Sequence, residues 1–305
     1  MYLLNYNSSG YSKFSSIMKN FVNMFNFREN GIIHTKNNCG RTCLHTAAVY
    51  GKFEVLKYLV NCGASLQDTD NKGNTALSLA VYYGHLDIIK YLVTKGSSLH
   101  GMFQGHTHLQ WSAIRGHLEI MKYLLSNGAH VEEKDEDDIS IIQLACMYGH
   151  IDIVVFLHQN GCSITEKNIV SQGTCLLYAS INGHLGVIKY LLANGSCIDE
   201  KSADDSAITF ASKGGYLETI QWLVNEKGCS LQEMNNEGTC VMNAAKKRHI
   251  DCVIWMLHNG SSLDENNSVG YSGKIYQVKS CRDILKNNGL YETAKKALTT
   301  KSSRK

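Results

Sequence analysis

A segment of about 33 residues recurs seven times along the chain, and this repeat constrains the fold more than any single residue does. Each copy ends its second predicted helix at a glycine, and successive glycines of this kind lie 33, 32, 33, 34, 33 and 32 residues apart: Gly63, Gly96, Gly128, Gly161, Gly195, Gly228 and Gly260. A fixed period of this length is typical of stacked helical hairpins, in which each unit contacts only its neighbours. The repeat therefore predicts a continuous solenoid without one central core.

The copy at residues 82–99 shows the second helix of the unit most clearly. Leu86, Ile89 and Val93 recur at helical spacing, and Gly84 precedes the helix. This position before the second helix holds glycine in six of the seven copies and arginine in the last: Gly51, Gly84, Gly116, Gly149, Gly183, Gly215 and Arg248. A helix of about ten residues is not stable alone, so stability must come from packing between units.

A shorter helix is predicted before each of these glycines, with a small residue three positions after an aliphatic one. The small residues are Ala47, Ala80, Ser112, Ala145, Ala179, Ala211 and Ala244, and the aliphatic residues are Leu44, Leu77, Leu109, Ile142, Leu176, Ile208 and Val241. Small side chains let two helices approach closely. The predicted N-caps are Thr42, Thr75, Thr107, Ser140, Thr174, Ser206 and Thr239, and Gln110 and Gln143 stand at capping-box spacing. An aromatic residue of the second helix is expected in the core: Tyr58, Tyr91, Tyr123, Phe156, Tyr190, Trp222 and Trp255.

These residues resemble those of the ankyrin-repeat family. Residues 40–51, GRTCLHTAAVYG, resemble the phrase G-x-T-P-L-H-x-A-A-x-x-G, with Cys43 in the proline place; residues 84–89 and 127–131 resemble the second-helix start and the exit into the hairpin. The resemblance covers residues 37–265 and implies an all-α ankyrin-repeat solenoid of helix–turn–helix units joined by β-hairpin-like loops, with degenerate caps. The chain departs from the phrase because it has no proline and keeps the histidine only at His45.

The organisation that we expect has three parts. Residues 1–36 form a degenerate N-terminal capping repeat, residues 37–265 form seven repeats, and residues 266–305 form C-terminal capping helices, at 276–287 and 290–298, with a basic tail. Residues 274–305 carry nine Lys and Arg against two acids, so the positive net charge of +3 comes from this end of the chain. No signal peptide or membrane span is recognisable, which indicates an intracellular, cytoplasmic protein, with the nucleus still open.

Neither the cysteines nor the histidines form a recognisable catalytic or metal-binding motif. The eleven cysteines contain no CxxC pair, so small buried residues in a reducing compartment are expected. Five histidines share one place of the repeat, which indicates a structural role: His85, His117, His150, His184 and His249. His106 and His108 flank a hairpin tip, but two ligands do not make a metal site. The sequence predicts no catalysis, no cofactor and no metal.

Two stretches carry enough charge to attract a partner. The acidic run at residues 132–138 lies at a predicted hairpin tip, where it is either a solvated turn or an electrostatic landing point for a basic partner. Lys246, Lys247 and Arg248 with the basic tail suggest nucleic-acid or anionic-surface binding. The net acidity of residues 1–273 argues against nucleic acid.

The strongest functional signal is the variable pair of residues before each first glycine, which in ankyrin-like units faces the concave surface. Exposed tyrosine, methionine and arginine are frequent in interface hot spots. The predicted partner-binding residues are Tyr50, Tyr82, Tyr83, Ile114, Arg115, Met147, Tyr148, Ile181 and Asn182. The alternative is that several of them pack against their own hairpins.

The leading hypothesis is a monomeric scaffold or adaptor that binds another protein on its concave face. Binding to an anionic surface through the C-terminal region is the alternative from the residues. The proline-free phrases KYLV and KYLL are similar to ankyrin proteins of giant DNA viruses and unicellular eukaryotes. That similarity implies host-protein binding or a role as substrate adaptor for a ubiquitin ligase.

Overall fold

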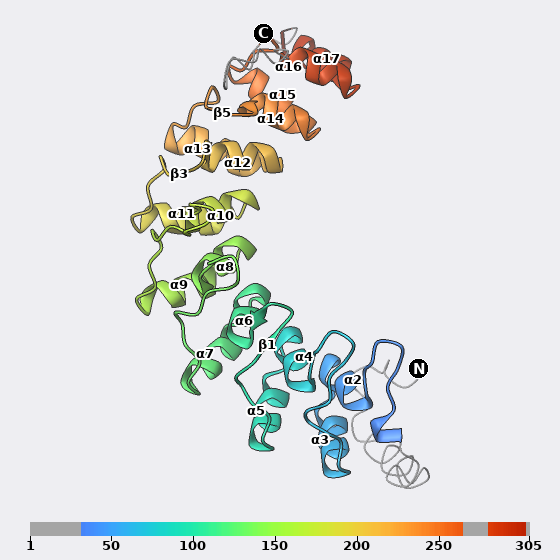
Figure 1. Cartoon of the computed structure of the whole chain (residues 1–305). Coiled ribbons are helices and arrows are strands. Elements are labelled where there is room, and N and C mark those ends of the chain that lie inside the picture. The colour runs from blue at the N-terminus through green and yellow to red at the C-terminus, as the bar shows by residue number, and fades with distance from the viewer. Residues whose placement is uncertain (1–31, 265–279, 303–305) are drawn as a thin grey trace. The chain divides into compact units, whose positions relative to one another are not determined.

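The computed structural model describes residues 32–264 and 280–302 (Figure 1). The chain divides into two compact units, residues 1–131 and 132–305, each described here by itself. The predicted N-terminal cap, residues 1–36, lies almost wholly outside the described residues.

In its described part, residues 32–131, the first unit is built from helical hairpins and one short β-hairpin. Its elements are η2 (Ile32–His34), α2 (Cys43–Val49), α3 (Phe53–Asn61), α4 (Ala76–Tyr83), α5 (Leu86–Thr94), β1 (Met102–Phe103), β2 (His106–Thr107), α6 (His108–Arg115) and α7 (Leu118–Ser126). The first helices of consecutive repeats, α2, α4 and α6, pack in a row, and α3 packs against α5 behind them. β1 and β2 are antiparallel, with Met102 opposite Thr107.

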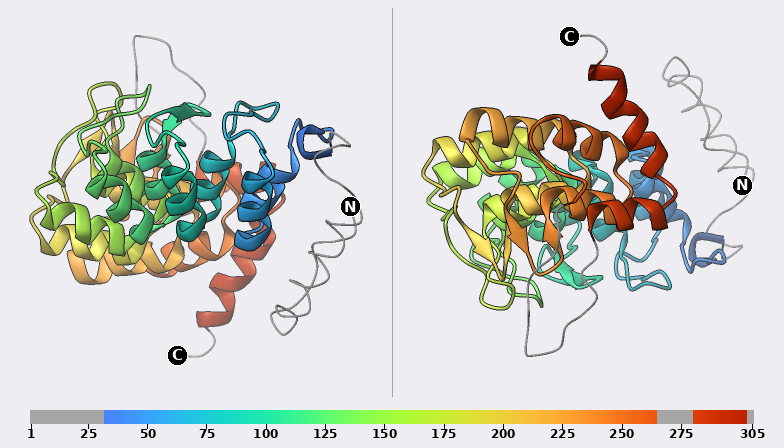
Figure 2. Two further views of the ribbon diagram at one scale, coloured as in Figure 1. Left: turned by 90° about the horizontal axis from the view of Figure 1, so that it is seen from below. Right: turned by 90° about the horizontal axis from the view of Figure 1, so that it is seen from above.

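The second unit continues the same pattern. Its elements are α8 (Ile141–Tyr148), α9 (Ile151–Gln159), α10 (Cys175–Ile181), α11 (Leu185–Ala193), β3 (Lys201–Ser202), β4 (Asp205–Ser206), α12 (Ala207–Gly214), α13 (Leu217–Lys227), β5 (Met234–Asn235), β6 (Gly238–Thr239), α14 (Cys240–Lys246), α15 (Ile250–His258), α16 (Cys281–Asn287) and α17 (Tyr291–Ser302). The row of first helices runs α8, α10, α12, α14 and α16. Figure 2 shows the same pairing of helices from two further directions.

The predicted C-terminal hairpin is present. α16 starts at Cys281 with Ser280 as its cap: the Ser280 hydroxyl oxygen accepts from the Asp283 N–H at 3.2 Å. The predicted helical residues 276–279 lie outside the described residues. α17 runs on to Ser302, four residues beyond the predicted end.

The small, aliphatic and N-cap residues that recur in the repeat have the positions that the sequence predicts. All seven small residues and all seven aliphatic partners of the first helices are buried. All seven predicted N-cap residues occupy the N-cap position, and Gln110 and Gln143 complete capping boxes as expected. The loops between units include three antiparallel β-hairpins, which confirms the expected fold class.

The recurrent aromatic residue of the second helix is half-buried, so its assignment to the core is wrong. It lies at the seam between second helices of consecutive repeats. The Tyr91 ring meets Phe53 edge-on at 5.6 Å, and the Tyr190 hydroxyl lies 2.8 Å from Nδ1 of His158. A ring of this size spans the gap between two short helices while its edge stays in contact with water.

A contact between glycine and histidine joins consecutive repeats. Gly84 has the left-handed φ of +87° that ends α4, and an added Cβ there would lie 2.7 Å from the His117 ring of the next repeat. Nε2 of His117 lies 3.3 Å from the Tyr82 carbonyl oxygen. The same pairing of histidine with a carbonyl two residues before the glycine recurs for His85 with Val49, His184 with Met147 and His249 with Lys213. The structural role predicted for these four histidines is confirmed.

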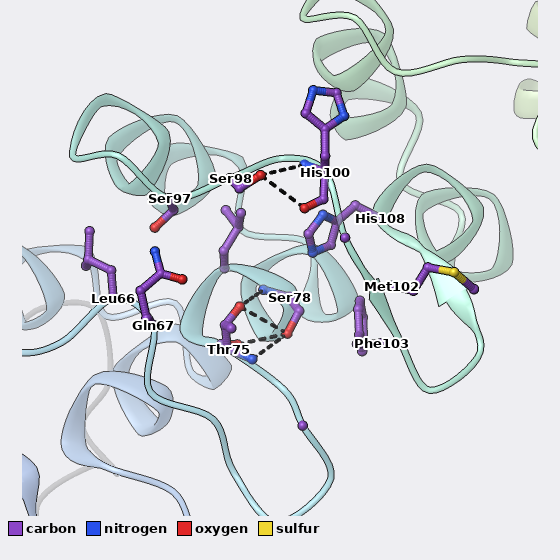
Figure 3. A pocket seen from close by; sticks show the side chains of 13 residues that line it. Leu66, Gln67, Thr75, Ser78, Ser97, Ser98, His100, Met102, Phe103 and His108 are labelled. Atoms are coloured by element: carbon purple, nitrogen blue, oxygen red, sulfur yellow. Dashed lines mark hydrogen bonds between the residues drawn. The ribbon is translucent and has the colours of Figure 1, made fainter.

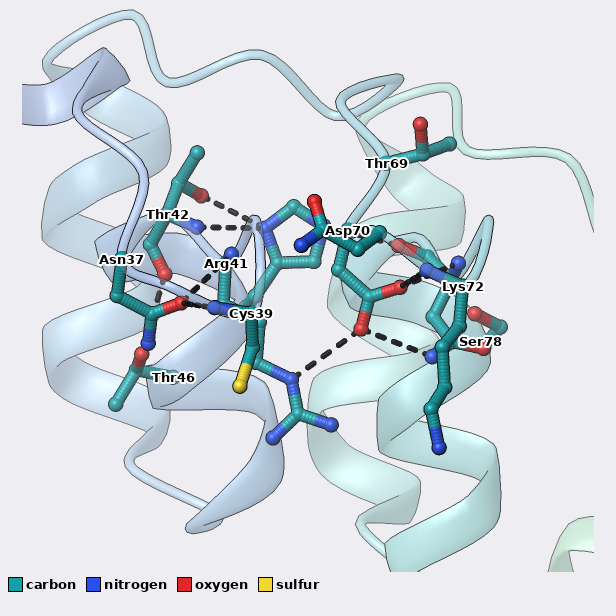
Figure 4. A network of polar contacts seen from close by, with 12 residues as sticks. Asn37, Cys39, Arg41, Thr42, Thr46, Thr69, Asp70, Lys72 and Ser78 are labelled. Carbon is teal, nitrogen blue, oxygen red and sulfur yellow. Dashed lines mark hydrogen bonds and ion pairs between the residues drawn. The ribbon is translucent and has the colours of Figure 1, made fainter.

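A buried polar network joins the first helix to the next hairpin tip (Figure 4). The backbone N–H of Thr42 donates to Nδ1 of His45 at 3.2 Å, so Nδ1 is the unprotonated ring nitrogen. Nε2–H of His45 then donates to the carbonyls of Asp68 and Asn74, each at 3.0 Å. Arg41 Nε lies 3.2 Å from the buried Asp70 carboxylate. Burial lowers the pKa of His45, which is neutral in this arrangement.

Gly84→Ala tests the glycine–histidine contact. We expect it to reduce the free energy of unfolding by about 2 kcal/mol or more, because the new methyl group overlaps the His117 ring in addition to the left-handed strain. Gly96→Ala is the control, since Gly96 also has a left-handed φ, +96°, but no atom within 4 Å of an added Cβ. It should cost about 1 kcal/mol. Urea denaturation of both variants measures the difference, and equal losses would contradict the contact.

His45 makes stability depend on pH. The unfolded chain binds a proton at His45 near pH 6.5, whereas the folded chain does so only at lower pH, so stability is complete above about pH 6.5 and falls as the pH decreases. His45→Gln should flatten this fall by up to about 1.4 kcal/mol per pH unit, because glutamine keeps the cap and does not titrate. Gln143 already has this role in α8: its Oε1 accepts from the Ser140 N–H at 3.0 Å. Urea midpoints from pH 7.5 to 5 give the two slopes, and parallel curves would disprove the assignment.

Candidate functional site

The residues before each first glycine lie on the last turn of the first helix. Because the glycine ends the helix, several of these side chains reach solvent. Tyr50 is 57% exposed, Tyr83 40%, Tyr148 48% and Ile181 36%. Each is a large, mainly apolar side chain that is exposed to solvent.

In the first unit these residues form an aromatic cluster with residues that the sequence analysis did not select. The Tyr82 ring meets the Tyr83 ring at 5.0 Å and the Trp111 ring at 4.9 Å, both edge-on. The guanidinium of Arg115 lies 4.6 Å from the Tyr82 ring centre, and its Nε donates to the Tyr82 carbonyl at 3.3 Å. We call these four residues, together with Tyr50 at the equivalent position of the preceding repeat, the tyrosine surface.

Trp111 connects this surface to the β-hairpin. Its indole stacks on Phe103 at 5.3 Å, and its Nε1–H donates to the Phe103 carbonyl at 3.0 Å. His106 meets the other side of the indole edge-on at 5.2 Å. Trp111 is the one tryptophan in a predicted first helix, a signal that was available in the sequence.

Two predicted binding residues have other positions or contacts. Ile114 is only 7% exposed, so its side chain packs inside the hairpin and does not reach the surface. Asn182 is half-buried, and its Nδ2–H donates to the Met147 carbonyl at 2.7 Å, a bond between consecutive repeats. The alternative that some of these residues pack against their own hairpins therefore holds for Ile114, whereas Asn182 bonds to the preceding repeat. In the second unit, Met147 is half-buried, and Tyr148 and Ile181 are exposed.

The basic stretch of the second unit is partly neutralised by its neighbours. Lys213 lies 2.9 Å from both the Asp205 and Glu237 carboxylates, and Lys246 lies 4.0 Å from Glu237. Lys247 and Arg248 are exposed. Carboxylates this close weaken attraction for a phosphate-bearing surface.

The cysteines are free thiols, and five of them are buried as expected: Cys146, Cys175, Cys240, Cys252 and Cys281. Burial raises the pKa of Cys229 and of Cys252 to about 11, and it also raises the pKa of Cys146. A thiol protonated at neutral pH is a poor nucleophile and a poor metal ligand. Cys39 and Cys197 are exposed, so the expectation of buried cysteines is wrong for these two.

A small cleft of about 110 Å³ lies between hairpin tips of the first unit (Figure 3). His108 is its most buried titratable residue; burial lowers the pKa of His108, and its Nδ1 lies 2.7 Å from the Leu99 carbonyl oxygen. The Ser78 hydroxyl in the wall donates to the Thr75 carbonyl at 3.0 Å as part of the cap of α4. No carboxylate is among the lining residues.

Within residues 32–264 and 280–302, no cluster of three or more His, Cys, Asp or Glu side chains has the geometry to hold a metal ion. None of the helices described in this part of the chain is both long and apolar enough to span a bilayer.

The arrangement of capped first helices, glycine-terminated turns and hairpin tips agrees with the comparison to known families. The model of the family described as "Ankyrin repeats (3 copies)" matches residues 11–101, 109–202 and 176–267. This chain belongs to the ankyrin-repeat family. Domains of this family are generally protein-binding scaffolds and typically have no catalytic activity.

Among solved structures, this ankyrin-repeat chain is similar to the crystal structure of the human ASB11 ankyrin repeat domain. The two are 25% identical, with a TM-score of 0.58, and the match covers 73% of this chain and 99% of that domain. No curated protein sequence matches the chain.

Trp111→Phe tests how firmly the tyrosine surface is anchored. The variant keeps an aromatic ring but removes the hydrogen bond to the Phe103 carbonyl, so it should lower the free energy of unfolding by about 1 kcal/mol more than Trp222→Phe. Trp222 is a matched control, because it is also half-buried and lies under the amines of Lys189 and Lys227. Urea denaturation followed by circular dichroism compares the two variants, and equal losses would remove the anchoring role.

Proposed function

We propose that this ankyrin-repeat protein is a non-catalytic scaffold that binds a partner protein through the tyrosine surface of its first unit. In the second unit we assign the same role to Met147, Tyr148 and Ile181. The observation that carries the proposal is the Tyr82 ring, which is held between Arg115 and Trp111 while Tyr83 beside it is 40% exposed.

The chemistry of this surface supports recognition of a protein. Tyrosine, tryptophan and arginine supply most of the binding free energy in many interfaces, because a large ring buries apolar area while its polar end keeps a hydrogen bond. The rings of Tyr83 and Trp111 already contact the Tyr82 ring before a partner arrives, so these three side chains lose little entropy on binding.

The free cysteines support a place for this protein inside the cell. All eleven are free thiols, and unpaired cysteines persist in reducing compartments. We propose that the protein acts there as a monomer.

Tyr50→Ala/Tyr83→Ala tests the proposed contact. The double variant should retain its fold, because both side chains are exposed. Its affinity for the partner protein should fall at least about tenfold. The wild-type chain and the variant are coupled to beads, and proteins captured from a lysate of cells that express the chain are quantified by mass spectrometry. Tyr148→Ala is measured separately, so that the contributions of the two units are resolved.

The matched control is Met102→Ser/Ile151→Ser, which removes two exposed apolar side chains that are not among the proposed binding residues. A partner lost by the tyrosine variant and kept by this control supports the proposal. Equal recovery of every captured protein by the wild type, the tyrosine variant and Tyr148→Ala would refute it.

A further inference from the structure

The most exposed large apolar side chains of the described residues are not on the tyrosine surface. They are Ile169 and Val170, which are 73% and 75% exposed at the hairpin tip between α9 and α10. Contiguous apolar side chains that are exposed and rimmed by polar residues are a feature of protein-interaction sites.

Hydrogen bonds hold this tip in one conformation. Asn168 is buried, and its Oδ1 accepts from the backbone N–H of Val170 at 2.9 Å and of Ser171 at 2.7 Å. Its Nδ2–H donates to the Asp137 carbonyl at 2.8 Å, and the Ile169 N–H donates to the Asp138 carboxylate at 3.0 Å. The aliphatic pair is therefore presented on a fixed turn, and binding would order little additional chain.

The next hairpin tip along the chain, residues 199–205, is hydrogen-bonded to the tip that carries Ile169 and Val170. The Ser202 hydroxyl, in β3, donates to the Ser171 carbonyl. Three consecutive tips, residues 132–138, 166–170 and 199–205, therefore lie together around Ile169 and Val170.

These tips are strongly acidic. They carry eleven carboxylates and three lysines, a formal net charge of −8. Lys134 is already paired with Asp138 at 3.3 Å and with Glu166 at 3.0 Å. Six carboxylate residues are exposed: Glu132, Glu136, Asp137, Glu166, Asp199 and Asp204. We call these six residues with Ile169 and Val170 the tip surface.

The charge decides which kind of partner fits. A nucleic acid or an anionic lipid surface would be repelled by these carboxylates, whereas lysine or arginine side chains would be attracted. An aliphatic pair inside an acidic rim is complementary to an apolar side chain flanked by basic ones.

We propose that the tip surface is a second protein-binding site, which takes a basic segment of another protein with apolar side chains between its lysines or arginines. The apolar pair supplies contact area, and the carboxylates accelerate association and select against anionic partners. This site is separate from the tyrosine surface and does not depend on it.

The test uses the full-length chain and synthetic peptides labelled with fluorescein. One peptide alternates lysine with valine, a second alternates lysine with serine, and a third alternates glutamate with valine. Fluorescence anisotropy measures the dissociation constant at low and at moderate salt. We expect the lysine–valine peptide to bind most tightly and to weaken as salt increases.

Two variants separate the contributions. Ile169→Ser/Val170→Ser keeps the charge of the tip surface and should raise the dissociation constant of the lysine–valine peptide about tenfold. Glu136→Gln/Asp137→Asn keeps the apolar pair and should weaken binding mainly at low salt. Tyr50→Ala/Tyr83→Ala should leave binding unchanged, so failure of this proposal and failure of the proposed function are distinguishable.

Three outcomes would overturn the proposal. The first is unchanged affinity in Ile169→Ser/Val170→Ser, with circular dichroism showing an intact fold. The second is equal affinity for the lysine–serine peptide, which would reduce the site to charge alone. The third is self-association of the free chain in analytical ultracentrifugation that disappears in Ile169→Ser/Val170→Ser, because a second copy would then be the occupant.

Discussion

The contact between a left-handed glycine and the histidine of the next repeat is the constraint on which each unit of this structure depends. The glycine ends the first helix, leaves room for the imidazole ring, and brings a backbone carbonyl within reach of Nε2. A helix of seven to nine residues has too few internal hydrogen bonds to be stable alone. Repeats joined in this way instead bury the small and aliphatic residues of their first helices against one another.

The same contact creates the surface available for function. Since the helix must end at the glycine, the two residues before it cannot both be buried, and their identity can vary without disturbing the stack. Tyr82, Tyr83 and Arg115 occupy such positions. The side chains at the hairpin tips can vary in the same way. The buried Asn168 side chain accepts the backbone hydrogen bonds of the turn, so the exposed side chains of Ile169 and Val170 are not needed to form it. Conserving the frame and varying its exposed residues lets an ankyrin-repeat protein acquire a partner without a new fold.

The sequence predicted most of the frame and only part of the candidate site. The N-caps, the buried slots and the histidine role follow from local rules that repeat at a fixed period, so seven copies support each inference. Ile114 was misplaced because an isoleucine one residue from an exposed arginine looks the same in sequence whether it faces inward or outward. Trp111 was missed because its contacts, with Phe103 and Tyr82, come from a hairpin and from the preceding repeat. The second-helix aromatics were assigned to the core because they recur at one position inside the helix, whereas in the structure each is only half-buried.

The sequence by itself determined the repeat, its period, the N-caps of the first helices, and the small and aliphatic residues that pack inside them. Those features depend on interactions within about 35 residues of chain, and at that range the spacing of residues in the sequence indicates which of them are close in space. Only the tertiary structure decided which variable residues reach solvent and which of them meet. Arg115 over Tyr82, and Asp138 holding the turn of Ile169, join neighbouring repeats. Their geometry depends on how one hairpin packs against the next, and residue spacing does not specify that packing.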